Sequence, residues 1–193
     1  GDRAIGHVRY STHGSSELKN AQPVIAHYED GEIAIVHNGN LTNADELREE
    51  LHSRGAIFQT TTDSEVVLHL LAKSSKKTLA DRVIDGLGKV QGAYSLIFLT
   101  QDTLMAVRDP HGFRPLVLGE LRGAKVLASE TCALDLIGAK FIREIEPGEL
   151  VIINKEGELT SLRPFTEVES RACVFEHIYF ARPDSRIFGA SVS

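Results

Sequence analysis

The sequence lacks most of the features that would place a chain outside ordinary globular proteins. Only two cysteines occur among 193 residues, Cys132 and Cys173, and no Cys-x-x-Cys pair is present. Two thiols are too few for a disulfide scaffold, so a reducing cytoplasm is the default compartment. No apolar run approaches the ~20 residues that span a bilayer, and no signal peptide opens the chain, so no membrane partner is expected.

The sequence also lacks an excess of positive charge. Lys and Arg number 21 against 27 Asp and Glu, which gives a net charge of −6, and no Lys/Arg block stands out. This balance argues against nucleic acid as a partner. The eight histidines form no His-x-x-x-His pair, so no metal site is expected within the chain. The hydrophobic content of 42% is enough for one substantial core.

The apolar patterns predict strands towards both ends of the sequence and helices between them. Helices are expected after Asn43 and after Thr62, each followed three residues later by a Glu that completes a capping box. Such a sequence predicts an α+β fold with sheets packed face to face and covered by helices. The remaining expected elements are strands at residues 5–10, 24–28, 33–37, 94–100, 104–108, 116–118, 126–129, 141–145, 150–153 and 159–162, and helices at residues 79–87 and 131–137.

The most informative stretch is the apolar run 33–36, which is followed by His37-Asn38-Gly39-Asn40. We expect a strand that ends at an Asn-Gly corner. Asn-Gly is a common hairpin turn signal. Gly39 also allows a close backbone approach, and Asn38 carries two N–H donors, so the same pair could hold a developing oxyanion. Taken alone, the dipeptide fits both interpretations.

Two other polar positions decide between them. Arg9 ends an apolar strand and can present its planar fork to a carboxylate, either that of a ligand or that of a structural acid. Asp63 begins a helix, where the helix dipole favours a carboxylate, and it could also hold a ligand ammonium. Together with Asn38 and Gly39, these groups complement an amino acid whose side-chain carbonyl is attacked, such as glutamine. A further polar turn, Asn20-Ala21-Gln22-Pro23, has no role assigned by its composition.

Several motifs resemble the glutaminase domain of the amidophosphoribosyltransferases, a family of class II glutamine amidotransferases. The resemblance covers nearly the whole chain and ends in a stretch typical of the junction with a phosphoribosyltransferase domain. The motifs are Arg9-Tyr10-Ser11-Thr12, Asn20-Ala21-Gln22-Pro23, His37-Asn38-Gly39-Asn40, Thr62-Asp63-Ser64-Glu65, residues 107–116 (VRDPHGFRPL) and residues 175–185 (FEHIYFARPDS).

The resemblance implies a four-layer αββα sandwich of the N-terminal-nucleophile hydrolase type. By this analogy Arg9 and Asp63 bind the α-carboxylate and α-amino groups of glutamine, Tyr10 and Thr12 belong to the same site, and Asn38 with Gly39 forms the oxyanion hole. Residues 1–170 would form the glutaminase domain, and residues 171–193 would lead to a phosphoribosyltransferase domain beyond this chain.

In this family the nucleophile is the N-terminal cysteine of the mature protein, whose own α-amino group is the general base. The sequence opens with Gly1-Asp2-Arg3-Ala4 and no initiator Met. We therefore expect the chain to lack both the nucleophile and its N-terminal strand, and to be inactive alone. Cys132 and Cys173 are expected to be buried structural thiols.

The resemblance further implies that the full-length enzyme makes 5-phosphoribosylamine from phosphoribosyl pyrophosphate and glutamine, the first committed step of purine biosynthesis. It implies a homo-oligomer with Mg²⁺ at the phosphoribosyl pyrophosphate site. Cys173 aligns with one ligand of the 4Fe-4S cluster that some members carry, although this chain needs no cofactor. The alternatives are another class II amidotransferase, or a non-catalytic amino-acid-binding or regulatory domain.

Overall fold

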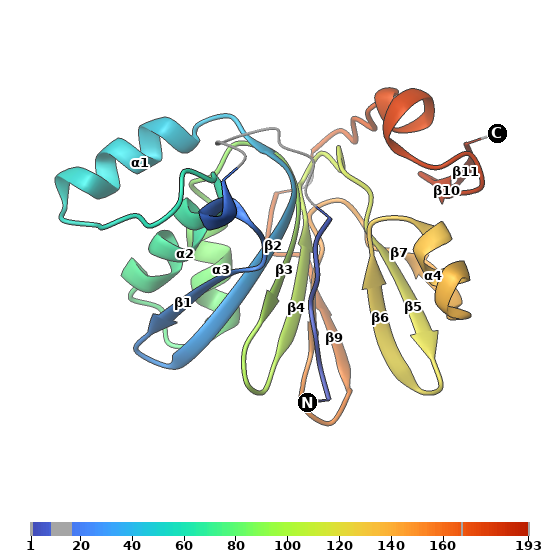
Figure 1. Ribbon diagram of the computed structural model, residues 1–193, viewed down its shortest axis with the longest axis horizontal. Coiled ribbons are helices and arrows are strands. Elements are labelled where there is room, and N and C mark those ends of the chain that lie inside the picture. Colours follow the sequence, from blue (N-terminus) through green and yellow to red (C-terminus); the bar gives the residue numbers. More distant parts are fainter. Residues whose placement is uncertain (1, 9–16, 167, 193) are drawn as a thin grey trace. The chain divides into compact units, whose positions relative to one another are not determined.

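A computed structural model describes residues 2–8, 17–166 and 168–192 of the chain. The chain divides into two compact units, residues 1–104 and residues 105–193. Figure 1 shows both units. In the described ranges, every helix is too short or too polar to cross a membrane.

Within its described residues, the first unit contains three antiparallel strands, three α-helices and a short 3-10 helix. The strand order is β1-β2-β3, with Val24 of β1 opposite Ile35 of β2 and Gly39 of β2 opposite Tyr94 of β3. In Figure 1, α2 and α3 lie beside this sheet. The elements are a short 3-10 helix (Leu18–Asn20), β1 (Val24–Tyr28), β2 (Gly31–Leu41), α1 (Ala44–Ser53), α2 (Ser64–Lys73), α3 (Leu79–Leu87) and β3 (Gly92–Leu99).

The core of the first unit forms where the apolar face of a strand packs against the apolar face of a helix. Ile33 and Ile35 lie on one face of β2 because they are two residues apart, and both are buried. Val67 and Leu71 lie one turn apart on α2 and are buried as well. The helix packs against β1 and β2, so its apolar stripe closes the face of the sheet that the isoleucines occupy.

The described part of the second unit contains strands of three sheets. One has the order β6-β5-β7, in another β8 pairs with β9 beside β4, and in the third β10 pairs with β11. Val117, Leu134 and Ala139 form a buried apolar cluster between α4 and the first of these sheets. The elements are β4 (Leu104–Arg108), β5 (Val117–Leu121), β6 (Ala124–Ala128), α4 (Thr131–Ile137), β7 (Lys140–Glu144), β8 (Leu150–Ile153), β9 (Leu159–Leu162), a π-helical turn (Glu176–Phe180), β10 (Arg186–Ile187) and β11 (Ala190–Ser191).

Most of the predicted elements are confirmed, and three local predictions are wrong. The strand predicted at residues 5–10 is absent from its described part, residues 5–8, where alternate residues are exposed and Val8 is 97% exposed. An alternating apolar segment becomes a strand only where a neighbouring strand pairs with it. Residues 9 and 10 lie outside the described residues.

The second error concerns the Asn-Gly corner. β2 continues through Asn38 and Gly39 to Leu41, and the hairpin turn lies instead at the other end of the strand, between Tyr28 and Gly31. Gly39 has φ +152°, and a Cβ built on it would lie 2.0 Å from the carbonyl oxygen of Ala93. Glycine is therefore required here by the close approach of β3, not by a turn.

The third error concerns the capping boxes. Asn43 stands at the N-cap of α1, but its side chain bonds the backbone of Lys89 and Gln91 instead of its own helix. α2 begins at Ser64 with Asp63 at the N-cap, one residue later than Thr62 would place it. The side chain of Asn43 bonds a segment far from its own helix, and the side chain of Thr62 bonds the segment before its helix. The spacing of residues along one helix does not reveal such partners.

Candidate functional site

Asp63 connects β2 with the start of α2. Its Oδ2 accepts a hydrogen bond from the backbone N–H of Leu41 at 2.9 Å, and its Oδ1 lies 3.3 Å from Nδ1 of His37. The residue is only 5% exposed. His37 and Leu41 thus hold the carboxylate of Asp63 beside the end of β2, the strand that carries Asn38 and Gly39. In the sequence, α1 lies between these two residues and Asp63.

The turn that holds Asp63 is fixed by side chains on either side of it. Asn20 is fully buried, and its amide makes two hydrogen bonds with Thr61, donating to Oγ1 at 2.8 Å and accepting from the backbone N–H at 2.9 Å. Glu65 accepts from the backbone N–H groups of Gln59 and Thr60. Residues 59–61, which precede Asp63, are therefore held by side chains on both sides of the turn.

Glu65 is held in its ionised form at this turn. Burial alone would raise its pKa, but the hydrogen bonds from His69, Gln59 and Thr60 together lower the pKa of Glu65 to about 2. The capping box that the sequence predicts, in which Glu65 would pair with Thr62, is replaced by this arrangement with the preceding loop. Glu65 is therefore a fixed acceptor that organises the loop before α2.

The polar turn at Asn20-Ala21-Gln22-Pro23 also reaches β2. Oε1 of Gln22 accepts a hydrogen bond from the backbone N–H of His37 at 2.6 Å. His37 is 4% exposed, and its side chain faces the same buried side as Ile33 and Ile35. The sequence motif contains His37, but its contribution was missed; the two-residue period from Ile33 was the signal that places it inward.

Asp63 thus lies beside β2 in the first unit and contacts His37 and Leu41, which stand on either side of Asn38 and Gly39 in the sequence. The three other predicted substrate-binding residues, Arg9, Tyr10 and Thr12, lie outside the described residues. The arrangement offers a buried carboxylate for a cationic group and a strand segment that carries a carboxamide. These are the chemical features that an amino-acid site requires.

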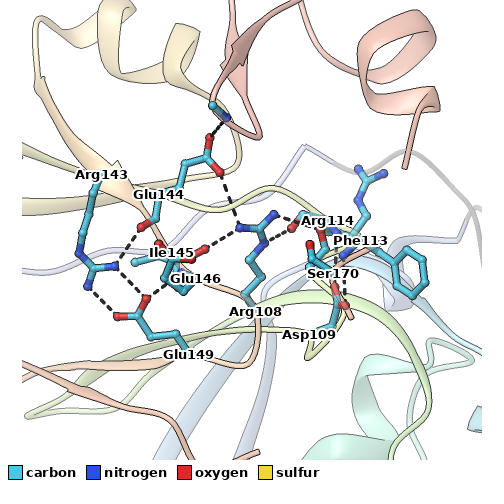
Figure 2. A network of polar contacts seen from close by, with 12 residues as sticks. Arg108, Asp109, Phe113, Arg114, Arg143, Glu144, Ile145, Glu146, Glu149 and Ser170 are labelled. Carbon is cyan, nitrogen blue, oxygen red and sulfur yellow. Dashed lines mark hydrogen bonds and ion pairs between the residues drawn. The ribbon is translucent and has the colours of Figure 1, made fainter. Parts of the chain in front are cut away.

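The second unit contains a larger polar network, shown in Figure 2, that holds residues 108–116 in place. Arg108 is 3% exposed and donates to the carbonyl oxygens of Gly112, Arg114 and Ile145 at 3.0, 2.8 and 2.6 Å. Asp109 is fully buried and accepts from the backbone N–H groups of Phe113 and Arg114. The network closes the 108–116 segment into a rigid loop and uses most of its polar groups for that purpose.

A buried carboxylate also anchors the β7–β8 region of this unit. Glu149 is 1% exposed; its Oε1 accepts from Arg143 at 2.6 Å and from Ser161 at 2.7 Å, and its Oε2 accepts from the backbone N–H of Glu146 at 2.7 Å. Although burial alone would raise the pKa of Glu149, these hydrogen bonds lower it. All of these partners are structural, so the network gives no open group for chemistry.

The C-terminal segment is part of the second unit. The carboxyl group of Glu176 contacts the guanidinium group of Arg114, and Glu130 accepts from the backbone N–H of Arg182 at 2.9 Å and from Ser185 Oγ at 2.8 Å. The segment nevertheless leaves several apolar side chains exposed, among them Ile178 at 72% and Tyr179 at 69%. Residues 171–192 are therefore docked on the unit through polar contacts and present an apolar outer surface.

Docking of this segment is expected to weaken as the pH rises. Burial raises the pKa of Glu176 to about 7, with Arg114 opposing the rise, so the docked state holds a proton that the undocked carboxyl loses near its ordinary value of 4.5. Stability is therefore lost between pH 5 and 8 as the docked carboxylate must ionise. Hydrogen exchange of residues 176–180, corrected for intrinsic rates, is expected to be roughly tenfold faster at pH 8 than at pH 6.

The matched variant for this measurement is Glu176→Gln, which keeps the shape of the side chain and cannot ionise. Its corrected exchange rates are expected to be the same at both pH values. Wild-type rates that are equal at pH 6 and pH 8 would contradict an ionisation at Glu176.

The environment of the Cys132 thiol is not that of a nucleophile. Cys132 is buried, and burial raises its pKa, which opposes formation of the thiolate. Cys173 is half-buried, and both residues are free thiols. Among the described residues no group of three His, Cys, Asp or Glu side chains could hold a metal ion.

Residues 7–136 match the family model described as a glutamine amidotransferase domain. The whole chain is 55% identical to amidophosphoribosyltransferase 2, chloroplastic, of Arabidopsis thaliana and 45% identical to the amidophosphoribosyltransferase of Bacillus subtilis (strain 168). It spans 34% and 40% of the lengths of these two relatives.

Solved structures give the same result. The chain is similar to glutamine phosphoribosylpyrophosphate amidotransferase from B. subtilis complexed with ADP and GMP, with a TM-score of 0.90 and 43% identity over 96% of this chain and 40% of that one. A glutamine aminotransferase class-II domain protein from Silicibacter pomeroyi is 17% identical, with a TM-score of 0.56 over 76% of this chain and 71% of that one, and shares the fold alone. The α+β fold of the N-terminal-nucleophile hydrolase type, predicted from the sequence, is confirmed.

Proposed function

The chain belongs to the glutamine amidotransferase domain family, and from this premise we propose that it is the glutamine-binding part of an amidophosphoribosyltransferase. The observation that carries the proposal is identity of 45–55% over the whole chain to relatives of that name. The full-length protein would take ammonia from glutamine and transfer it to phosphoribosyl pyrophosphate, forming 5-phosphoribosylamine in the first committed step of purine biosynthesis. Its partners would be glutamine and a phosphoribosyltransferase domain of the same polypeptide.

In this proposal the residues of the first unit bind and polarise glutamine. The ionised carboxylate of Asp63 holds the α-ammonium group, while Arg9 holds the α-carboxylate together with Tyr10 and Thr12. Asn38 and Gly39 donate hydrogen bonds to the carbonyl oxygen of the side chain as it becomes tetrahedral.

The nucleophile is a cysteine in the proposed reaction, and we place it outside this chain. Cys132 is unsuited to the role because burial raises its pKa. Attack by a thiolate on the glutamine amide would form a tetrahedral intermediate, and its collapse would release ammonia and leave a thioester on the cysteine. Water would then hydrolyse the thioester to glutamate and restore the thiol.

The remaining parts of the proposal concern the whole protein. A Mg²⁺ ion would be held at the phosphoribosyl pyrophosphate site of the second domain, and the protein would form a homo-oligomer. The expected compartment is the cytoplasm; the plant relatives are named chloroplastic, which makes the chloroplast the alternative. Fractionation of the source cells distinguishes the two compartments.

The variant Asp63→Asn tests the proposed function in the full-length protein. Asparagine still accepts the hydrogen bond from Leu41, but it removes the charge that binds the α-ammonium group. Loss of one charged hydrogen bond costs about 2–3 kcal/mol, so the glutamine KM is expected to rise about 30- to 160-fold. Activity with ammonia as the nitrogen donor is expected to stay within about twofold of the wild type, because ammonia bypasses the glutamine site.

Asp102→Asn is the matched control, since Asp102 is an exposed residue of the same unit. It is expected to leave both activities unchanged. An equal loss with glutamine and with ammonia in Asp63→Asn would assign Asp63 a purely structural role. A wild-type protein that makes no phosphoribosylamine with either nitrogen donor would refute the proposed function itself.

A further inference from the structure

His37 lies between the two elements that carry the candidate site. It belongs to β2, directly before Asn38, and its side chain is 1% exposed. Its Nδ1 lies 3.3 Å from Oδ1 of Asp63 and 3.4 Å from Oγ of Ser64, both at the start of α2. A buried ring thus joins the strand of the oxyanion candidate to the carboxylate proposed for the α-ammonium group.

The hydrogen-bond pattern determines which ring nitrogen carries the proton. An ionised carboxylate only accepts hydrogen bonds, so the contact between His37 and Asp63 requires a proton on Nδ1. In the neutral ring Nε2 is then an acceptor. Ser64 Oγ contributes its own hydrogen bond to the same carboxylate oxygen at 3.4 Å, so it does not compete for the role of proton donor at Nδ1.

Nε2 of His37 is buried and has no hydrogen-bond partner among the described residues. It lies 2.8 Å from the point where a Cβ on Gly39 would stand, so it borders the α-carbon of that glycine. A buried polar atom without a partner costs free energy and is rare in a folded protein unless a ligand or a function requires it. The open acceptor is therefore placed beside the candidate oxyanion residues.

We propose that His37 is a positioning residue of the glutamine site, whose Nδ1–H orients the carboxylate of Asp63 and whose Nε2 accepts a hydrogen bond from a donor of the bound amino acid. The inference rests on the proposed function. With Leu41 on one carboxylate oxygen and His37 on the other, the Asp63 carboxylate is held in one orientation, which is the orientation offered to the α-ammonium group. The ring takes no part in bond making or breaking.

Three substitutions in the full-length protein separate the two ring nitrogens. His37→Asn places an amide donor near the position of Nδ1 and removes the group at Nε2. His37→Gln places an amide near the position of Nε2 and removes the donor to Asp63. His37→Ala removes both. The glutamine KM is expected to rise about three- to tenfold in His37→Asn and in His37→Gln, each of which loses one of the two contacts, and by more than tenfold in His37→Ala, which loses both.

Ammonia-dependent activity in all three variants is the readout that a merely structural role would move. We expect it to remain within twofold of the wild type, while only the glutamine KM changes. An equal rise in KM across the three variants, together with loss of ammonia-dependent activity, would overturn the positioning role. Wild-type KM values in all three would overturn it as well.

The wild-type protein provides a test that does not depend on the folding of any variant. Nitrogen-15 spectra of the wild-type protein labelled at histidine are expected to show His37 protonated at Nδ1 and bare at Nε2, with added glutamine shifting the Nε2 resonance. The opposite tautomer, or an Nε2 resonance indifferent to glutamine, would refute the inference. A wild-type protein that neither binds nor uses glutamine would refute the proposed function instead, so the two failures are distinguishable.

Discussion

Replacing Gly39 by alanine is expected to destabilise the first unit by about 3–5 kcal/mol and to abolish glutamine-dependent activity of the full-length protein. The added Cβ would lie 2.0 Å from the carbonyl oxygen of Ala93 and 2.8 Å from Nε2 of His37. The first contact is with the backbone of β3, which cannot rotate away as a side chain can. β2 and β3 would have to separate at the point where β2 carries Asn38.

Hydrogen exchange of β2 and β3 in the full-length protein measures this effect, because it reports opening of these strands apart from the rest of the chain. Gly31→Ala is the matched control. Gly31 is in the same strand and also has positive φ, +116°, but a Cβ there would meet nothing within 4 Å. Gly31→Ala is expected to reduce stability only by the cost of placing alanine at positive φ, about 1–2 kcal/mol. Equal losses at the two glycines would show that the approach of β3 is not what requires glycine at position 39.

The sequence predicted the first unit well because its signals are local. The two-residue period of residues 33–37 and the helical spacing of Val67 and Leu71 determine which side chains are buried without reference to other parts of the chain. The hairpin that joins β1 to β2 follows from the polar residues 29–32 in the same way. For these elements the local preference and the packed structure agree.

The errors arise where a distant segment determines the conformation. Gly39 was expected to end a strand because Asn-Gly favours turns, yet pairing with residues 92–99 extends β2 to Leu41. Asn43 was expected to cap its own helix, but the backbone of Lys89 and Gln91 takes both ends of its amide. No spacing within the sequence reports that residues more than 40 positions apart compete for the same hydrogen bonds.

The candidate site shows the same division. Asp63 and Asn38 were identified by residue type, because a carboxylate at a helix start and an amide beside glycine suit a small set of ligands. His37 was missed because a buried histidine is ambiguous until its partners are known. Its contact with Asp63 depends on α2 packing against β2, which is a tertiary property.

The second large effect is expected at Arg108, in the network of Figure 2. Arg108→Met fits the apolar part of the side chain, but it leaves the carbonyl oxygens of Gly112, Arg114 and Ile145 without this donor. Each buried acceptor that loses its partner costs about 1–3 kcal/mol, so a total loss of about 3–5 kcal/mol is expected after local relaxation. The loss would appear as faster hydrogen exchange at residues 112–116 and 144–146.

Arg108→Lys distinguishes charge from geometry at this position. Lysine keeps the charge near Glu144, which lies 3.7 Å from Nη1 of Arg108, but one ammonium group cannot reach three carbonyl oxygens that the guanidinium fork contacts in different directions. We therefore expect Lys to recover less than half of the loss. Arg163→Met, at an exposed residue of the same unit, is expected to change nothing. Full recovery by Lys would mean that the ion pair with Glu144, and not the three backbone contacts, holds the 108–116 loop.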